Sequence, residues 1–391
     1  MTTFSETDER QELRRQVGKL AGKYGREWFT EKARSGEKTT DLWLEVAKNG
    51  YLGINIPEEY GGGGGGIGDI AAVCEELAAQ GCPLLLMVVS PAICGTIITR
   101  YGTPAQKQRW LPGICDGTGT MAFAITEPDA GTNTHNITST ARRDARSDGQ
   151  SGWVLNGQKI YISGVDEADN VLVVARAEDA RTGKLKPCLF VVPTDADGFE
   201  YKPIPMEIVS PELQFTVFID DVRLPADALV GDEDAGLVQL FAGLNPERIM
   251  AASFSTGLAR FALDRAVQYA KEREVFQGPI GGHQAIAHPL AQTHIEVELA
   301  RLMTQKAAAL CDAGEDMVAG EAANMAKYAA AEAACDAADR AVQTHGGNGI
   351  TQEYGMAGLL VATRAGRIAP VSREMILNFV SMHSLGLPKS Y

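Results

Sequence analysis

The chain has 391 residues, of which 45% are hydrophobic and 22% are charged. These values are typical of a folded globular protein, and the length exceeds one ordinary hydrophobic core, so we expect two or three domains. The formal net charge of −14 disfavours nucleic acids and anionic membranes as partners, because binding to phosphate groups requires a basic surface.

The N-terminal region and the cysteines predict a cytoplasmic protein. Asp8, Glu9 and Glu12 interrupt the region where a signal peptide would have its apolar core. The longest apolar run, residues 83–89, is too short to span a bilayer. The seven cysteines contain no Cys-x-x-Cys pair, which fits reduced thiols. The His and Cys spacings predict no metal site.

Residues 1–120 predict a helical domain. Apolar residues recur at helical spacing near the N-terminus, and residues 70–80 and 84–100 predict two further helices, the second almost wholly apolar and therefore buried. Six consecutive glycines at 61–66 have no side chains to pack, so we expect a flexible surface loop there.

Residues 121–232 predict an antiparallel β-domain, in the form of a small barrel. Short β-branched or aromatic runs at 171–174, 189–192 and 215–219 alternate with turn-rich stretches. From 233 to 391 the pattern is helical again, in long pieces with short connections, which predicts a four-helix bundle. An Ala-rich helix over 321–344 ends before Gly346 and Gly347.

Two blocks in the β-domain, 123–132 and 156–164, predict a ligand site. The first is an apolar run that stops at Glu127-Pro128 and turns at once. The second places Tyr161 and Ser163 on one face of an extended strand. A ring to stack on beside a hydroxyl suits a flat heteroaromatic ligand. Either block alone fits an ordinary strand and turn about equally well.

The order helices, barrel, helix bundle, together with these blocks, resembles the acyl-CoA dehydrogenase family. The resemblance covers essentially the whole chain and implies an α+β multidomain fold. The stretches that carry it are 57–62, 101–107, 111–112, 123–132, 156–164, 221–225, 273–284 and 343–347.

The resemblance implies that FAD binds between barrel and bundle. On the barrel it implies cofactor contacts from Phe123, Ile125, Thr126, Tyr161 and Ser163. Tyr161 stands where the family usually stacks a Trp on the flavin, and Ser163 where it usually has a Thr that bonds flavin N5. Both substitutions keep the aromatic face and the hydroxyl.

The resemblance also implies that a neighbouring subunit completes the cofactor site. Arg273, Phe276 and Gln284 would form an arm that reaches the FAD of another subunit, with Arg273 on the pyrophosphate. A second segment would approach the pyrophosphate by its backbone; its residues are Gln343, Gly346 and Gly347. The two glycines also fit a helix C-cap, and the two roles do not conflict.

Substrate contacts and partners follow from the same resemblance. Thr132 would contact the pantetheine arm of an acyl-CoA, and Arg248 would lie beside the substrate, although a solvated helix arginine is the alternative. The family transfers electrons to an electron-transfer flavoprotein and forms dimers and dimer-of-dimers tetramers, so we expect a homotetramer.

The reaction requires a carboxylate that takes the α-proton while hydride leaves Cβ for flavin N5. Most of the family places it in a C-terminal Tyr-Glu-Gly-Thr sequence, which this chain lacks; Ser372-Arg373 stands there instead. The isovaleryl-CoA and long-chain branch places the base in a Glu-Arg pair on the first long bundle helix. Glu247 is therefore the predicted base, with Glu374 as the alternative.

A competing interpretation makes Glu247 an ordinary first-turn acid, with Asn245 as N-cap and Pro246 at the first helical position. There the helix dipole would lower its pKa, against the requirement of a base. Two other functions are compatible with the fold: a flavin monooxygenase or nitroalkane-oxidase-like enzyme, and a non-catalytic flavoprotein of the DNA-binding alkylation-response type, which the acidic charge disfavours.

Overall fold

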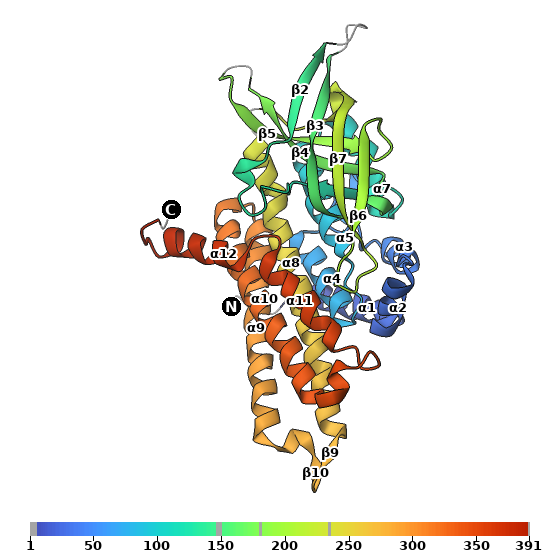
Figure 1. The fold of residues 1–391 in the computed structure, drawn as a ribbon, viewed down its shortest axis with the longest axis vertical. Helices are drawn as coiled ribbons and strands as arrows, with labels where there is room; N and C mark the ends of the chain where they lie inside the picture. The colour runs from blue at the N-terminus through green and yellow to red at the C-terminus, as the bar shows by residue number, and fades with distance from the viewer. Residues whose placement is uncertain (1–5, 146–150, 180–181, 234–235, 390–391) are drawn as a thin grey trace.

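The computed structural model describes residues 6–145, 151–179, 182–233 and 236–389. Figure 1 shows an elongated molecule with a β-domain at one end, N-terminal helices beside its middle and a bundle of long helices that extends to the other end. Helical N- and C-terminal parts and a sheet-forming middle part are thus as predicted.

The regular secondary structure described in the N-terminal part is helical. Its helices are α1 (Asp8–Ala21), α2 (Gly25–Ser35), α3 (Thr40–Lys48), α4 (Ile67–Ala79), α5 (Leu85–Met87), the π-helical η2 (Val88–Gly95), α6 (Thr96–Tyr101) and α7 (Pro104–Asp116), with the short 3-10 helix η1 (Glu58–Tyr60). The predicted helix over 84–100 is one continuous buried segment made of α5, η2 and α6. Its middle winds as a π-helix around Pro91, which lacks the N–H that an α-helical turn would use.

The glycine run 61–66 is at the surface, but its backbone is fixed by hydrogen bonds. The amides of Gly63 and Gly65 donate to the carbonyls of Gly53 and Ile54, at 3.0 and 2.8 Å. A Cβ on Gly62 would lie 2.0 Å from the carbonyl oxygen of Ile56. The prediction of a flexible loop is therefore wrong: here glycine permits close contact between two backbone segments.

Over its described residues, the middle part contains eight strands in one sheet. They are β1 (Met121–Ala124), β2 (Thr140–Ala145), β3 (Ser151–Ser163), β4 (Asn170–Glu178), β5 (Leu185–Pro193), β6 (Phe199–Ile204), β7 (Gln214–Pro225) and β8 (Leu229–Val230). The order is β6-β7-β3-β2-β4-β5-β8, and β1 pairs with β4. Their inward side chains form a separate hydrophobic core.

The sheet differs from the predicted antiparallel barrel in two respects. Strands β1 and β2 each pair with β4 in parallel, so the sheet is mixed. Among the described strands, the hydrogen-bonded path ends at β6 and at β8 without a pairing that joins them, so closure into a barrel is not shown.

The C-terminal part is built on four long or medium helices that pack together: α8 (Gly236–Glu272), α9 (Gln284–Asp312), α10 (Asp316–His345) and α11 (Ala357–Ile368). The turn between α8 and α9 contains the small hairpin β9 (Glu274–Val275) and β10 (Gly278–Pro279), and α12 (Arg373–Phe379) follows α11. Buried alanines along α10 let its neighbours approach closely.

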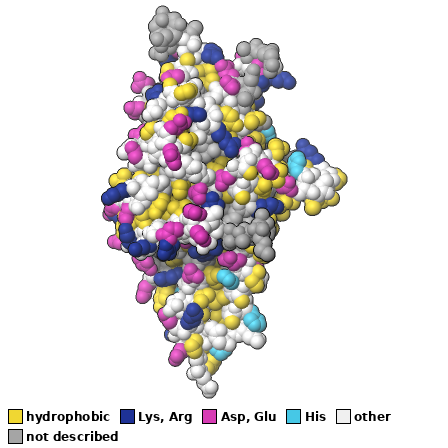
Figure 2. Space-filling model, turned by 180° about the vertical axis from the view of Figure 1, so that it is seen from behind, with side chains coloured by type: hydrophobic (Ala, Val, Ile, Leu, Met, Phe, Trp, Pro, Cys, Tyr) yellow, Lys and Arg dark blue, Asp and Glu magenta, His cyan; other side chains and the backbone are white. Residues whose placement is uncertain are grey.

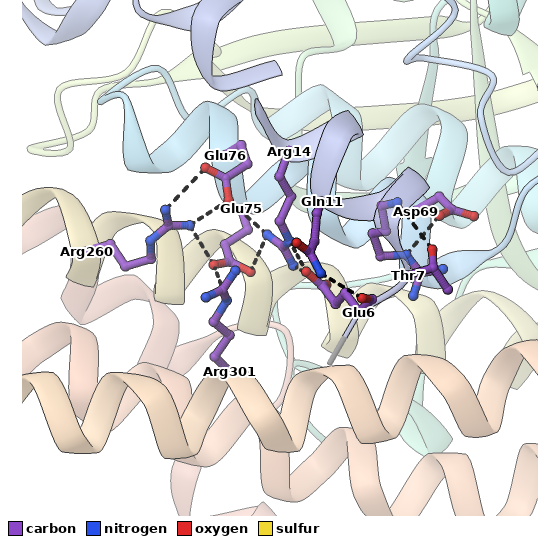
Figure 3. Close-up of polar contacts among 10 residues, drawn as sticks. Glu6, Thr7, Gln11, Arg14, Asp69, Glu75, Glu76, Arg260 and Arg301 are labelled. Carbon is purple, nitrogen blue, oxygen red and sulfur yellow. Dashed lines mark hydrogen bonds and ion pairs between the residues drawn. The ribbon is translucent and has the colours of Figure 1, made fainter. Parts of the chain in front are cut away.

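A buried ion network joins the N-terminal helices to the bundle (Figure 3). Arg14 of α1 donates to Glu75 and Glu76 of α4 at 2.9 and 3.0 Å. Arg260 of α8 donates to the same two carboxylates at 2.7 and 2.8 Å, and Arg301 of α9 lies 3.1 Å from Glu75. Because each buried charge here has opposite charges beside it, the network fixes how four helices sit against one another.

Candidate active site

A tight turn ends β1. The backbone groups of Glu127 and Ala130 exchange two hydrogen bonds of 3.1 Å, which makes the turn predicted around Pro128 and Asp129. Phe123 is buried within β1, whereas Ile125 and Thr126 are partly exposed just before the turn. Thr132 follows the turn and is exposed.

A buried ion pair that the sequence did not reveal fixes this turn. Lys159 of β3 is fully buried, and its Nζ donates to Glu127 Oε1 at 2.9 Å and to the carbonyl of Ile125 at 3.2 Å. The other oxygen of Glu127 accepts from the amide and hydroxyl of Thr138 at 2.6 and 2.8 Å. Burial raises the pKa of Glu127, but hydrogen bonds from Ser139 and Thr138 and the charge of Lys159 outweigh it and hold the pKa at about 2.

The end of β1 lies directly beside the second predicted block. The amide of Ile160 donates to the carbonyl of Thr126 at 2.9 Å, one residue before Tyr161. The structure therefore brings Ile125 and Thr126 together with Tyr161 and Ser163, as expected for one ligand site.

Tyr161 does not have the extended conformation that the alternating pattern predicts. Its φ is +59°, and the register of β3 against β7 shifts between Lys159 and Ile162. The bulge buries Ile162 in the sheet core and leaves the Tyr161 ring 57% exposed. A left-handed tyrosine is strained, and such strain is concentrated at functional sites. The hydroxyl of Ser163 donates to Gln214 at 3.0 Å and keeps its oxygen as an acceptor.

The other predicted cofactor residues gather at the far end of the bundle. Arg273, Phe276 and Gln284 lie around the β9–β10 hairpin and are exposed; Phe276, at the tip, is 99% exposed with a φ of +55°. Gln343, Gly346 and Gly347 at the end of α10 are also exposed. Gly346 caps α10 with a φ of +57°, so the expected C-cap is confirmed.

Tyr269, which the sequence did not single out, connects these two segments. Its carbonyl accepts from the amide of Arg273 at 2.8 Å, its ring stacks on His345 with the centroids 4.3 Å apart, and its hydroxyl accepts from Asn348 at 3.1 Å. Figure 1 places this hairpin and the β-domain at opposite ends of the molecule. One chain therefore does not bring the two predicted groups of cofactor residues together.

Glu247 lies well inside α8, eleven residues after its first residue, Gly236. The interpretation of Glu247 as a first-turn acid is therefore wrong. Asn245 does not cap the helix; its amide donates to the carbonyl of Asp316 at 3.1 Å. Burial raises the pKa of Glu247 to about 7, while the charges of Arg248 and Lys327 oppose the rise.

The surroundings of Glu247 connect it to the β-domain. One turn before it, a Cβ on Gly243 would lie 2.5 Å from Ile97, so α8 crosses η2 and α6 in close contact. Burial raises the pKa of Cys94 in η2, and the charge of Glu247 raises it further. The thiol of Cys94 donates to the carbonyl of Ala122 in β1 at 3.5 Å. The carboxylate is thus near β1, the strand that precedes Ile125 and Thr126.

Two buried cations accompany Glu247. Arg248 donates to Asn245 Oδ1 at 3.0 Å, and its buried Nε has no hydrogen-bond partner among the described residues. Burial lowers the pKa of Arg248, and the charge of Glu247 opposes this effect. Lys327 of α10 is 1% exposed, and nothing in the sequence pattern distinguished it.

Glu374, the alternative base, has a different environment. It is exposed in the first turn of α12, a helix capped by the hydroxyl of Ser372, which accepts from the amide of Met375 at 3.3 Å. A first-turn acid in water fits helix capping and lacks the burial that would adapt it to proton abstraction at neutral pH.

Three family models together match most of the chain. The acyl-CoA dehydrogenase N-terminal domain matches residues 7–118, the middle domain 122–217 and the C-terminal domain 234–385. The chain is 64% identical over 390 residues to acyl-CoA dehydrogenase FadE12 of Mycobacterium tuberculosis, covering 100% of this chain and 99% of the relative. The chain belongs to the acyl-CoA dehydrogenase family. It is therefore an oxidoreductase and a flavoprotein, and its cofactor is FAD.

Solved structures of the family have the same fold. Butyryl-CoA dehydrogenase from Megasphaera elsdenii matches with a TM-score of 0.90 and 29% identity over 98% of this chain and 99% of its own. A glutaryl-CoA dehydrogenase from Mycobacterium smegmatis in complex with FADH2 matches with a TM-score of 0.89 and 26% identity over 99% of this chain and 96% of its own.

The side chains at the two predicted cofactor surfaces fit FAD. Tyr161 and Phe276 present exposed aromatic rings to which a flat ligand can bind. A Cβ on Gly346 or Gly347 would meet no atom within 4 Å, so an anionic group can approach the backbone there.

The described residues contain no group of three or more His, Cys, Asp or Glu arranged to hold a metal ion. Within the same part of the chain, no helix combines the length and apolar character that crossing a membrane would require.

Proposed function

We propose that this enzyme converts an acyl-CoA thioester to the trans-2-enoyl-CoA, with Glu247 as the base that takes the α-proton. The single observation that carries the proposal is a partly buried carboxylate with a pKa of about 7, next to two buried cations and close to β1. A base with a pKa near the working pH combines a useful ionised fraction with sufficient proton affinity.

The direction of the pH dependence follows from this pKa. Glu247 must be ionised to accept a proton, so activity should rise as the pH increases through about 7. The exposed Glu374 has no comparable environment, which favours Glu247.

For the cofactor, we assign the two groups of residues described above to one FAD site made by two chains. Ile125, Thr126, Tyr161 and Ser163 of one chain would hold the flavin, with Phe123 supporting their strand from the core. The second chain would contribute the hairpin and α10-end residues: Arg273, Phe276, Gln284, Gln343, Gly346 and Gly347. FAD, when bound, supplies the acceptor for the hydride from the β-carbon.

For the substrate, we assign Thr132 to the pantetheine arm and Arg248 to the region beside the acyl group. Thr132 is exposed after the turn that ends β1, and Arg248 has a buried Nε free to donate among the described residues. We further propose that the three functional parts of the chain are residues 1–120, 121–232 and 233–391.

We propose a cytoplasmic homotetramer that passes electrons to an electron-transfer flavoprotein. Exposed apolar side chains support association: Ile295, Leu299 and Leu302 of α9 recur at helical spacing and are 59%, 61% and 49% exposed. On the face drawn in Figure 2, hydrophobic side chains are exposed both over the middle of the molecule and over its narrow end, and charged side chains lie among them.

The experiment is anaerobic flavin reduction by acyl-CoA substrates in Glu247→Gln. The amide keeps the shape of the side chain but accepts no proton, so we expect an FAD-loaded yellow protein whose flavin is reduced at least about 10²-fold more slowly. Glu374→Gln is the matched control and should reduce at the wild-type rate.

The same measurement separates the alternatives. If acyl-CoA reduces the flavin of Glu247→Gln at the wild-type rate but no longer reduces that of Glu374→Gln, the base is Glu374. Rapid reoxidation of the substrate-reduced enzyme by air would indicate an oxidase or monooxygenase, and failure of straight, branched and aromatic acyl-CoAs to reduce the wild-type flavin would indicate a non-catalytic flavoprotein.

A further inference from the structure

Lys327 is a buried lysine in the middle of the bundle. Its side chain is among the largest fully buried ones of the molecule, and its Nζ donates to the carbonyl of Val371. Lysine is almost never fully buried unless its charge is compensated. Its position in an otherwise Ala-rich helix therefore needs a cause.

The packing of α10 against α8 directs Lys327 toward the proposed base. Asn245 of α8 donates to the carbonyl of Asp316 at 3.1 Å, and a Cβ on Gly320 would lie 3.2 Å from Asn245 Oδ1. Lys327 is seven residues after Gly320, about two helical turns, and so shares the face of α10 that contacts α8. Lysine side chains in helices point back toward the N-terminus, which here is the direction of Glu247.

The charges around Lys327 come from three helices. Besides Glu247 and Arg248 on α8, Glu332 on α10 and Glu374 on α12 act on it through their charges. Glu332 is already paired with Arg367 at 2.8 Å and lies 3.5 Å from Arg373. From η2, Cys94 is the further titratable group beside Glu247, and it is buried.

We propose that Lys327 is a positioning residue of this active site, which anchors the 370–372 segment through Val371 and presents to Glu247 the positive charge that keeps it ionised. This inference rests on the proposed role of Glu247. The anchored segment leads directly into Arg373 and includes Ser372, and the resemblance places the base of most family members at these two positions, so Lys327 connects that segment to the proposed base on α8.

Lys327 and Glu247 each shift the pKa of the other in the direction that favours its charged form. The charge of Lys327 lowers the pKa of Glu247 against the effect of burial. Burial and the charge of Arg248 lower the pKa of Lys327 to about 8, while Glu332, Glu374 and Glu247 oppose this change. Between pH 7 and 8 the carboxylate and the ammonium group are therefore each at least about half charged, which is where the base is needed.

The test compares Lys327→Gln with Lys327→Arg in the FAD-loaded enzyme. Gln keeps a donor for Val371 but has no charge, whereas Arg keeps the charge. The rate of anaerobic flavin reduction by an acyl-CoA is measured from pH 5.5 to 9. In Lys327→Gln we expect the acidic limb of the pH–rate profile to move up by about 0.5–1 pH unit. The rate of flavin reduction at low pH should therefore fall about three- to tenfold, and the difference from the wild type should disappear above the raised pKa of Glu247. In Lys327→Arg the limb should stay in place.

A purely structural lysine would give a different result. The rate of flavin reduction would fall by the same factor at all pH values, or the acidic limb of the pH–rate profile would move equally in Lys327→Gln and Lys327→Arg. Either result overturns the proposal. If Lys327→Gln is recovered without FAD, Lys327→Met, which keeps the apolar stem, replaces it with the same expectation. Glu247→Gln is measured in parallel. If flavin reduction is lost in Glu247→Gln but the acidic limb of the pH–rate profile does not move in Lys327→Gln, only the role of Lys327 is refuted. If flavin reduction is retained in Glu247→Gln, the proposed base is refuted.

Discussion

At the scale of single residues, the pair Glu127–Lys159 holds the strand end from which the flavin contacts are proposed. Glu127 accepts hydrogen bonds from Thr138, Ser139 and Lys159, and is 4% exposed. The turn geometry beside Ile125 thus depends on two charges that water does not solvate. Replacing one of them leaves the other buried without compensation.

We predict that Glu127→Gln lowers the free energy of unfolding by about 3–5 kcal/mol at pH 7, because Lys159 then stays buried without its counterion. The double variant Glu127→Gln with Lys159→Met should lose less than the single variant. Urea unfolding monitored by circular dichroism measures both. Equal losses in the single and double variants would show that the two charges do not act as a pair.

The same carboxylate gives a pH dependence with a definite sign. Its pKa is about 2 in the folded protein and 4.5 without the fold, so its contribution to stability is complete above about pH 4.5 and is lost as the pH falls toward 2. The urea midpoint of the wild type should therefore fall more steeply between pH 5 and 3 than that of Glu127→Gln. Parallel slopes would contradict the low pKa.

At the scale of elements, the close crossing of α8 over α4 depends on Gly257. A Cβ there would lie 2.3 Å from the carbonyl oxygen of Glu75 and 2.6 Å from the Cβ of Ala78. Because backbone atoms cannot move aside cheaply, we predict that Gly257→Ala destabilises the protein by about 1–3 kcal/mol. Thermal unfolding of the FAD-loaded protein measures the change.

Gly358 in α11 is the matched control, since a Cβ there meets no atom within 4 Å. Gly358→Ala should raise stability by up to about 1 kcal/mol, because alanine loses less backbone entropy in a helix. Destabilisation of similar size in both variants would mean that the helix crossing does not require glycine at 257.

Sequence periodicity predicted most elements of this fold but not the local departures on which the site depends. The helical spacing in the bundle and the β-branched runs over 171–174 and 189–192 correspond to helices and strands of the structure. The bulge at Tyr161 could not be predicted, because the alternation of side chains continues through a residue whose left-handed φ is imposed by pairing with β7.

The start of α8 was also hidden from local signals. Asn245-Pro246 is a favoured pair for a helix N-terminus, yet α8 begins at Gly236 because its first turns pack against η2 and α6 at Gly243. Lys327 was overlooked for the same reason: a single lysine in an Ala-rich helix looks solvent-exposed until the neighbouring helices are placed around it.

At the scale of the whole molecule, the proposed cofactor residues are divided between two distant regions. Tyr161 and Ser163 belong to β3, whereas Arg273 and Phe276 belong to the β9–β10 hairpin region. Figure 1 shows β3 and this hairpin in opposite parts of the molecule. Sequence resemblance predicted both groups and assigned the second group to a neighbouring subunit, which agrees with this separation. In the proposed assembly a second copy of the chain supplies the other half, and two-fold symmetry would make the contribution of each chain to the other reciprocal.

This arrangement predicts complementation between two defective chains. Tyr161→Asp places a charge against the proposed flavin face, and Arg273→Glu reverses the charge proposed for the pyrophosphate, so each variant alone should lose FAD. In a mixed dimer one site combines both defects while the other has none. Each mixed dimer has one intact site of two, so the mixed dimers, which purification through both tags selects, should carry about half of the wild-type FAD content.

The measurement is the flavin absorbance per chain after co-purification of two differently tagged variants. The matched control is co-expression of Tyr161→Asp with a second, differently tagged Tyr161→Asp chain, in which every site carries the same defect and no FAD should return. Recovery only when the two defects lie in different regions requires a site shared between chains. If a mixed dimer forms normally but its FAD content does not recover, the β-domain residues and the hairpin residues do not share one FAD site. The hairpin tip would then need another ligand to account for its fully exposed Phe276.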